Sequence, residues 1–149
     1  MIPKKRVLFI CTANSARSQM AEGFLNHLGQ EHWRAESAGL FSSFVHPLAI
    51  RVMEETGIDI SKQRSKSLDQ FFGQEFDYLI TLCDHAAQSC PVFPGHGKRL
   101  HWSLEDPAGA MGTMEERLNV FRRIRDEIRV RIEEFLKAHP SEEIKNPPS

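Results

Sequence analysis

RVLFICTANSARSQMAEG, residues 6–23, is the segment around which the rest of this chain is organised. Its opening residues 6–10 are mostly apolar and include β-branched side chains, which predicts a short buried strand. Residues 18–27 carry apolar side chains at helical spacing, which predicts a helix. The residues between them, 11–17 or CTANSAR, form a tight loop that leads from the strand into the helix.

This loop predicts an oxyanion site with a thiol at its floor. Backbone N–H groups at a loop-to-helix junction point at whatever occupies the loop, and the helix dipole adds positive potential. A helix N-terminus, a guanidinium and a hydroxyl donor each favour the nucleophilic thiolate over the thiol. We therefore expect Cys11 as nucleophile, Arg17 as a bidentate ligand of the anion and Ser18 as a hydrogen-bond donor to the sulfur. The alternative is a buried cysteine that packs as a small hydrophobe.

The sequence VLFICTANSARSQMAEG resembles the phosphate-binding loop of the low-molecular-weight tyrosine phosphatases and, more closely, that of the thioredoxin-coupled arsenate reductases that share their fold. Gln19 favours the reductases, because the phosphatases carry a proline there. One departure is Ala13, where the family usually shows glycine, since a Cβ makes a left-handed backbone less favourable. Asn14 tolerates that conformation. The resemblance implies that the bound oxyanion contacts Thr12, Ala13, Asn14, Ser15, Ala16 and Arg17.

Length and composition predict one soluble globular domain. The chain has 149 residues, of which 40% are hydrophobic and 26% are charged, and this is enough to bury a core. A net charge of −1 predicts no broad attraction to nucleic acid or membranes. The sequence shows no signal peptide or membrane-length apolar run, so we expect a cytoplasmic protein. We also expect a monomer. Residues 1–138 form the predicted catalytic domain, and the polar, proline-rich residues 139–149 a flexible C-terminal tail.

The rest of the chain alternates strand and helix patterns. Such alternation predicts a three-layer α/β/α domain with a parallel sheet, whose ligands bind at the carboxyl ends of the strands. Cys11 and Cys83 both follow strands and so lie at that edge. The family resemblance implies four strands in the order 2-1-3-4, which makes their two strands neighbours. Thr113 and Glu116 predict a capping box. The further strands are expected at 34–38, 76–82 and 98–101, and the further helices at 47–55, 68–72 and 113–138.

A second chemical feature is TLCDHAAQSCP, residues 81–91, which holds the other two cysteines. Cys83 and Cys90 are seven positions apart, and this spacing does not match the pairs of zinc sites. A zinc site that combines them with His85 and Cys11 is the weaker alternative, and a core cysteine that follows an apolar strand is the stronger one. Together with Cys11, the pair predicts a redox relay, because three thiols along one sheet edge can pass a disulfide from a buried to an exposed position by thiolate exchange. Three cysteines, an odd number, also argue against a static disulfide framework in a reducing compartment.

The same segment resembles the part of the reductases that carries their second and third redox cysteines, a pair that the phosphatases lack. The resemblance implies that Cys83 attacks Cys11 and that a Cys83–Cys90 disulfide then forms, which thioredoxin reduces. If residues 83–90 are helical in the reduced protein, their ends are roughly 10 Å apart. A disulfide tolerates Cα separations of only about 4.4–6.8 Å. Oxidation is therefore expected to unwind residues 84–89.

The third feature is HWSLEDPA, residues 101–108. Transfer of a phosphoryl or arsenyl group needs an acid to protonate the leaving oxygen. Pro107 restricts Asp106 to an extended conformation and so gives its carboxyl group a set direction. The alternatives are an ordinary turn aspartate and Glu105 as the acid. Resemblance to the family's acid loop, HW-x-x-x-DPA, favours Asp106.

We expect neither a cofactor nor a metal. Some family members bind potassium near the loop through residues like Asn14, Glu22 and Ser37, together with a threonine and an aspartate in the connector that follows the second helix. In this chain Arg64 and Lys66 stand at the positions where those family members carry the threonine and the aspartate. A lysine ammonium can occupy a cation site as a fixed charge. The alternative is that Arg64 and Lys66 simply face solvent.

The predicted function is reduction of arsenate to arsenite, with phosphate and sulfate as competing oxyanions and thioredoxin as the reductant. The alternative is a low-molecular-weight protein tyrosine phosphatase, since the loop and the acid serve that chemistry as well, and weak phosphatase activity is expected in either case. A third class is a phosphate- or redox-sensing binding module. It would require an inert Cys11, which the electrostatics of the loop disfavour.

Overall fold

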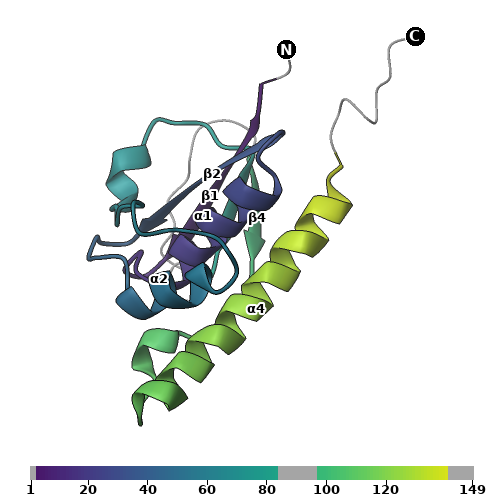
Figure 1. Ribbon diagram of the computed structural model, residues 1–149. Coiled ribbons are helices and arrows are strands. Elements are labelled where there is room, and N and C mark those ends of the chain that lie inside the picture. The colour runs from purple at the N-terminus through teal and green to yellow at the C-terminus, as the bar shows by residue number, and fades with distance from the viewer. Residues whose placement is uncertain (1–2, 84–96, 141–149) are drawn as a thin grey trace.

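The computed structural model describes residues 3–83 and 97–140. The strands of these residues are interspersed with α-helices and short 3-10 helices (Figure 1). The elements lie at or close to their expected positions, except that a short 3-10 helix, η2, falls within a stretch that we expected to be loop. In chain order they are β1 (Lys5–Cys11), α1 (Arg17–Leu28), β2 (Trp33–Gly39), α2 (Pro47–Glu54), the 3-10 helix η1 (Leu68–Phe71), β3 (Tyr78–Thr81), β4 (Lys98–His101), η2 (Pro107–Gly109) and α4 (Met114–Ala138).

The sheet has four parallel strands in the order β2-β1-β3-β4, which confirms the expected order. Ile10 of β1 pairs with Ala38 of β2 on one side and with Thr81 of β3 on the other. The carboxyl ends of these three strands therefore lie at one edge of the sheet. The loop that follows β1 and the segment that follows β3 begin side by side at that edge.

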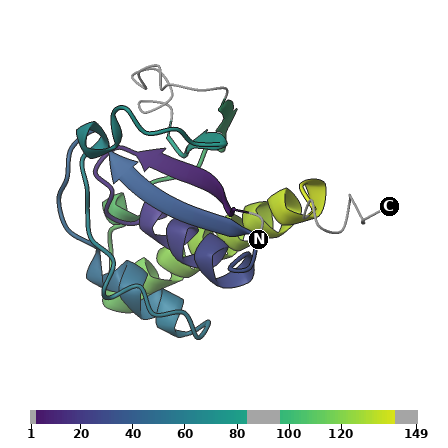
Figure 2. The same ribbon diagram turned by 90° about the horizontal axis from the view of Figure 1, so that it is seen from above.

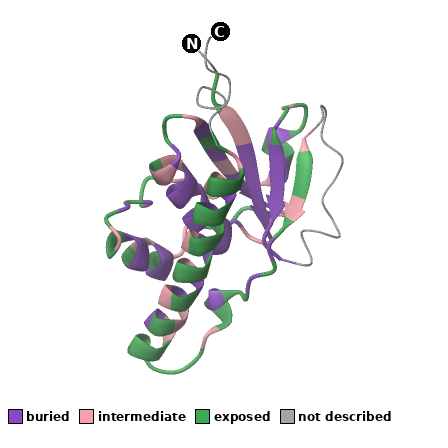
Figure 3. Cartoon of the chain, turned by 90° about the vertical axis from the view of Figure 1, so that its right-hand side faces the viewer, coloured by how far each residue is buried: buried purple, intermediate pink, exposed green. Residues whose placement is uncertain are grey.

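The core is built around β1, the central apolar strand. Leu8, Phe9 and Ile10 are fully buried, and because side chains alternate along a strand, Leu8 and Ile10 lie on one face and Phe9 on the other. Figure 3 shows the buried central strands of the sheet. Helices α1, α2 and α4 lie together on one side of the sheet, and α4 packs against both other helices (Figure 2). Full burial of such a side chain stabilises the folded state by about 1.5–3 kcal/mol. The loop that starts at the last residue of β1 is therefore attached to a well-packed strand.

Helix α4 starts at the expected capping box. The Glu116 N–H donates to Thr113 Oγ1 at 3.1 Å, and the Thr113 N–H donates to Glu116 Oε1 at 3.0 Å. His139, which we assigned to the tail, packs its ring on Phe135 at a centroid distance of 4.5 Å. Among the described residues no helix is long and apolar enough to cross a membrane. The buried stripe of α4 consists of Leu118, Phe121, Ile124, Ile128, Ile132 and Phe135.

Candidate active site

The loop between β1 and α1 turns its backbone carbonyls outward. Each carbonyl from Cys11 to Ser15 accepts a hydrogen bond from a group outside the loop, and no described peptide bond is cis. In a trans peptide the N–H points opposite to the C=O. The N–H groups of the residues that follow each carbonyl therefore point into the loop, as an anion requires. The bonds run from Leu40 N to Cys11 O (3.2 Å), Phe41 N to Thr12 O (3.3 Å), Ser43 Oγ and Ser65 Oγ to Ala13 O (3.0 and 3.2 Å), Gln19 Nε2 to Asn14 O (3.1 Å) and His46 N to Ser15 O (3.0 Å).

Asn14 takes the left-handed backbone that the tight loop needs, with φ at 50°. Its side chain is fully buried. Oδ1 accepts from Gln19 Nε2 at 2.9 Å and from the Lys66 N–H at 2.7 Å, while Nδ2 donates to Ser18 Oγ at 2.8 Å and to Ser37 Oγ at 2.9 Å. The left-handed residue is thus Asn14, so the alanine at position 13 does not strain the loop.

Cys11 is buried at the floor of this loop, at the end of β1. Its Sγ lies 2.9 Å from Ser18 Oγ. Because that oxygen already accepts from the Asn14 amide, the Ser18 hydroxyl proton can be directed at the sulfur. The predicted donor therefore stands in place, and a hydrogen bond of this kind stabilises a thiolate.

Arg17, the first residue of α1, reaches the segment that holds the expected acid. Its Nη1 donates to the Leu104 carbonyl at 3.1 Å, and its Nη2 lies 3.6 Å from Asp106 Oδ2. Asp106 has the extended backbone that Pro107 favours, and its Oδ1 accepts from the Ala108 N–H at 3.0 Å. Arg17 is buried, whereas the Asp106 side chain is 54% exposed. The carboxyl group is therefore held beside the guanidinium and remains open to solvent and substrate.

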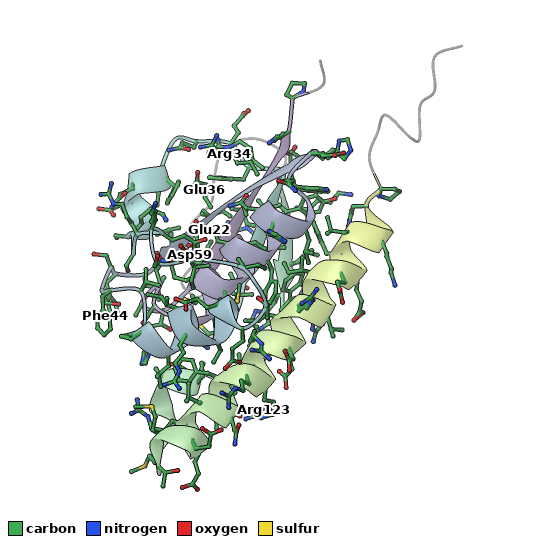
Figure 4. All side chains as sticks on the ribbon, viewed as in Figure 1. Glu22, Arg34, Glu36, Phe44, Asp59 and Arg123 are labelled. Atoms are coloured by element: carbon green, nitrogen blue, oxygen red, sulfur yellow. The ribbon has the colours of Figure 1, made fainter. Side chains whose placement is uncertain are left out.

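The rival carboxylate, Glu105, points elsewhere. Its Oε1 accepts from Arg123 Nη2 at 3.1 Å, and Arg123 projects from the exposed side of α4 (Figure 4). The two neighbouring carboxylates thus have different partners: Asp106 lies beside the arginine of the loop, and Glu105 pairs with an arginine of α4. This arrangement favours Asp106 over Glu105 as a group that can reach an anion in the loop.

Cys83 lies against the same loop. It is buried two residues beyond β3, and its Sγ is 3.2 Å from the hydroxyl of Thr12, the residue that follows Cys11. The neighbouring positions of β1 and β3 in the sheet cause this approach. Cys90, His85 and the predicted unwinding of residues 84–89 fall outside the described part of the chain. Within that part, no three histidine, cysteine or acidic side chains gather as metal ligands would.

Lys66 lies in the position where the sequence suggested a fixed cation, beside Glu22. Its Nζ lies 3.5 Å from Glu22 Oε1 and donates to the Arg64 carbonyl at 2.9 Å, and only 15% of its side chain is exposed. Burial raises the pKa of Glu22, and Lys66 together with a hydrogen bond from Ser37 opposes that rise. The side chain of Glu36, also in Figure 4, adds to the rise. Lys66 therefore does not simply face solvent, although Arg64 is exposed.

The sequence analysis assigned no part in holding the loop to four residues that the structure places around it. Gly39 directly follows the strand expected at 34–38, and a Cβ there would lie 2.6 Å from the Asn14 nitrogen and 2.8 Å from the Ala13 carbonyl carbon. The glycine that ends the strand was the available signal. The roles of Gln19, Ser43 and Ser65 as donors to loop carbonyls carry no signal in the sequence, because their partners are recognisable only after folding.

Comparison with known proteins agrees with this geometry. Residues 6–146 match the model of the low molecular weight phosphotyrosine protein phosphatase family. An arsenate reductase from Halalkalibacterium halodurans is 51% identical over 133 residues, which cover 89% of this chain and 95% of that protein.

Solved structures agree as well. An arsenate reductase in the phosphate-binding state superposes with a TM-score of 0.73 and 39% identity, covering 91% of this chain and 99% of its own. The thioredoxin-dependent arsenate reductase of Corynebacterium glutamicum superposes with a TM-score of 0.71 and 32% identity, and the match covers 91% of this chain and 62% of that chain. Together with the four-stranded sheet and the cysteine loop, these matches place the protein: it belongs to the low molecular weight phosphotyrosine protein phosphatase family.

Proposed function

We propose that this protein reduces arsenate to arsenite. The observation that carries the proposal is the contact of a second buried thiol with the anion loop, Cys83 Sγ to Thr12 Oγ1 at 3.2 Å. Hydrolysis of a phosphate ester needs one nucleophile and an acid, whereas reduction by thiols needs a second sulfur close to the first. The arsenate reductases among the relatives support the same conclusion.

The reaction starts at Cys11. Its thiolate attacks arsenic while the loop N–H groups and Arg17 hold the oxyanion, and Asp106 protonates the oxygen that departs as water. This step forms the S–As bond and leaves arsenic as As(V). Phosphate and sulfate have the same tetrahedral shape and compete for the loop.

Electron transfer follows at Cys83. Its thiolate attacks the Cys11 sulfur, the S–As bond breaks, and its electron pair stays on arsenic, which leaves as As(III) arsenite. Two thiols have then lost two electrons to form the Cys11–Cys83 disulfide. Cys90 attacks Cys83, frees Cys11 and leaves a Cys83–Cys90 disulfide for the dithiol of thioredoxin to reduce. The thiols supply the electrons, so no cofactor is needed, and the cycle suits the reducing cytoplasm.

The test is a coupled assay with arsenate, thioredoxin, thioredoxin reductase and NADPH, run beside hydrolysis of p-nitrophenyl phosphate. The wild type should consume NADPH only when arsenate is present and should hydrolyse the ester weakly. Cys11→Ser should lose both activities, because a serine alkoxide is not available near neutral pH.

Cys83→Ser and Cys90→Ser separate the two chemistries. Both variants should lose arsenate turnover and keep ester hydrolysis, which needs no second thiol. Equal loss of both activities would assign the two cysteines a structural role. Absence of arsenate-dependent NADPH consumption in the wild type would refute the proposed function with this reductant.

A further inference from the structure

We propose that Ser43 and Ser65 are positioning residues that set the orientation of the Ala13–Asn14 peptide in the oxyanion loop. Neither serine belongs to the loop. Ser43 lies between β2 and α2, next to Phe44, which is labelled in Figure 4, and Ser65 lies in the connector before η1. The inference rests on the function proposed above, because it assigns residues to the binding of the same oxyanion.

The two hydroxyls converge on one carbonyl. Ser43 Oγ donates to Ala13 O at 3.0 Å, and Ser65 Oγ donates to the same oxygen at 3.2 Å. Ser65 Oγ also accepts the Ser43 N–H at 2.8 Å. A hydroxyl has one proton, so the Ser65 proton is available for Ala13 while its oxygen serves Ser43. The two serines thus form a clamp that uses both lone pairs of the Ala13 oxygen.

Of the carbonyls from Cys11 to Ser15, only Ala13 O accepts from two side chains among the described contacts. It also precedes Asn14, the residue with the left-handed backbone. The Ala13–Asn14 peptide packs against Gly39, where a Cβ would lie 2.6 Å from the Asn14 nitrogen. The Ala13–Asn14 peptide is thus held by the serine clamp at its carbonyl oxygen and by the close contact with Gly39 at its nitrogen.

The orientation of this peptide decides the sign of its interaction with an anion. With the Ala13 carbonyl held outward, the Asn14 N–H points into the loop and can donate to the oxyanion. If the peptide plane rotates, the carbonyl oxygen turns toward the anion and repels it. The clamp therefore acts on oxyanion affinity through the backbone, without touching the anion.

The test measures binding of inorganic phosphate by calorimetry, together with arsenate KM and kcat. Ser43→Ala or Ser65→Ala alone should weaken phosphate binding only about two- to threefold, because the other hydroxyl still holds the carbonyl. The double variant should weaken it roughly tenfold or more, with a matching rise in arsenate KM and a kcat within about twofold of the wild type. Ser42→Ala, at the exposed neighbouring serine, is the matched control.

Ser43→Thr and Ser65→Thr keep a hydroxyl and should retain phosphate affinity. Wild-type phosphate affinity in the double alanine variant would overturn the inference. A loss of affinity that tracks a fall in melting temperature, and that threonine does not rescue, would overturn it as well, since it would indicate a structural role. Phosphate binding needs no reduction, so a wild type that binds phosphate but does not reduce arsenate would refute the proposed function and leave this test intact.

Discussion

Asn14 shows how one side chain can organise an anion loop. Its left-handed backbone is unusual for a residue other than glycine, and such conformations persist where the surroundings over-determine them. The buried amide meets Gln19, Lys66, Ser18 and Ser37, each contact contributing about 0.5–1.5 kcal/mol. One residue thus fixes the loop backbone and also orients the Ser18 hydroxyl toward Cys11.

Asp106 carries a prediction at the same scale. Asp106→Asn should slow hydrolysis of phosphate esters by roughly 10²–10⁴-fold, the usual contribution of a positioned general acid. An amide cannot protonate the leaving oxygen, although it can still accept from the Ala108 N–H and keep the local turn. The measurement is kcat/KM for a series of aryl phosphates with different leaving groups.

The loss should shrink as the leaving group becomes better, because a stable phenolate needs no proton. Glu105→Gln is the matched control, since Glu105 pairs with Arg123 instead of Arg17, and it should leave the leaving-group dependence unchanged. If Asp106→Asn lowers kcat/KM by the same factor for every leaving group, the acid is water or another side chain.

At the scale of elements, helices α2 and α4 are joined by a carboxylate with two arginines. Glu55, directly after α2, pairs with Arg122 at 2.8 Å and with Arg125 at 2.7 Å. Arg125 also donates to the Val52 carbonyl at 2.9 Å. The hydrogen bonds from Arg122, followed by those from Arg125, lower the pKa of Glu55 to about 2. This contact holds α2 against α4. The residues just before α2, Ser43 and His46, donate to the loop carbonyls and are anchored with it.

Glu55→Gln should lower the free energy of unfolding by about 0.5–1 kcal/mol at pH 7, a small value because the carboxylate is partly exposed. The pKa of Glu55 is lower in the folded than in the unfolded chain, where it is near 4.5. The stabilisation is therefore complete above about pH 4.5 and is lost as the pH falls toward 2. Urea unfolding of both proteins from pH 7 to pH 2 measures it.

The difference in the free energy of unfolding between the wild type and Glu55→Gln should accordingly vanish as the pH approaches 2. Glu54→Gln, at the exposed last residue of α2, is the control for removing one negative charge from the same helix end. If Glu54→Gln and Glu55→Gln destabilise the protein equally at every pH, the effect belongs to net charge and the two arginines contribute nothing specific.

At the scale of the whole molecule, the site depends on segments that only the sheet and its connections bring together. Lys66 illustrates this: its backbone N–H holds Asn14 of the loop, while its ammonium lies beside Glu22 of α1. The pair is largely enclosed, with 15% of the Lys66 side chain and 10% of the Glu22 side chain exposed. We therefore expect that the protein needs no added monovalent cation at this position.

Lys66→Met should lower the free energy of unfolding by about 2–4 kcal/mol at neutral pH, because it leaves the Glu22 carboxylate buried without its cation. Burial already raises the pKa of Glu22 above its ordinary value of 4.5. Protonation of Glu22 therefore favours the folded state, so the loss should be smallest near pH 4.5 and should grow as the pH rises. Denaturant unfolding across this pH range measures the effect.

The double variant Lys66→Met/Glu22→Gln should recover most of the lost stability and lose the pH dependence, because no buried charge remains. The wild type should show the same arsenate turnover and stability in potassium chloride and in sodium chloride at equal ionic strength. A wild-type requirement for potassium would show that Lys66 does not serve as the cation of the site.

Features that depend on neighbours along the chain could be predicted from the sequence. The strand, the loop and the helix around Cys11 follow from apolar periodicity and from a run of small polar residues. Asn14 was expected to tolerate a left-handed backbone, Pro107 to extend Asp106, and Thr113 with Glu116 to cap α4, and all three are confirmed. These features are local, so a pattern of a few residues is enough to specify them.

The distant residues that complete the loop are brought to it by the packing of the folded chain. Ser65 lies 52 positions from Ala13, and Cys83 lies 71 positions from Thr12. Their contacts require β1 to lie between β2 and β3, and the alternation of strands and helices does not specify that order. A serine hydroxyl or a lysine ammonium looks the same in sequence whether it faces water or a loop carbonyl. The packed sheet settles the difference, because it removes water and leaves each buried polar group only the partners that folding supplies.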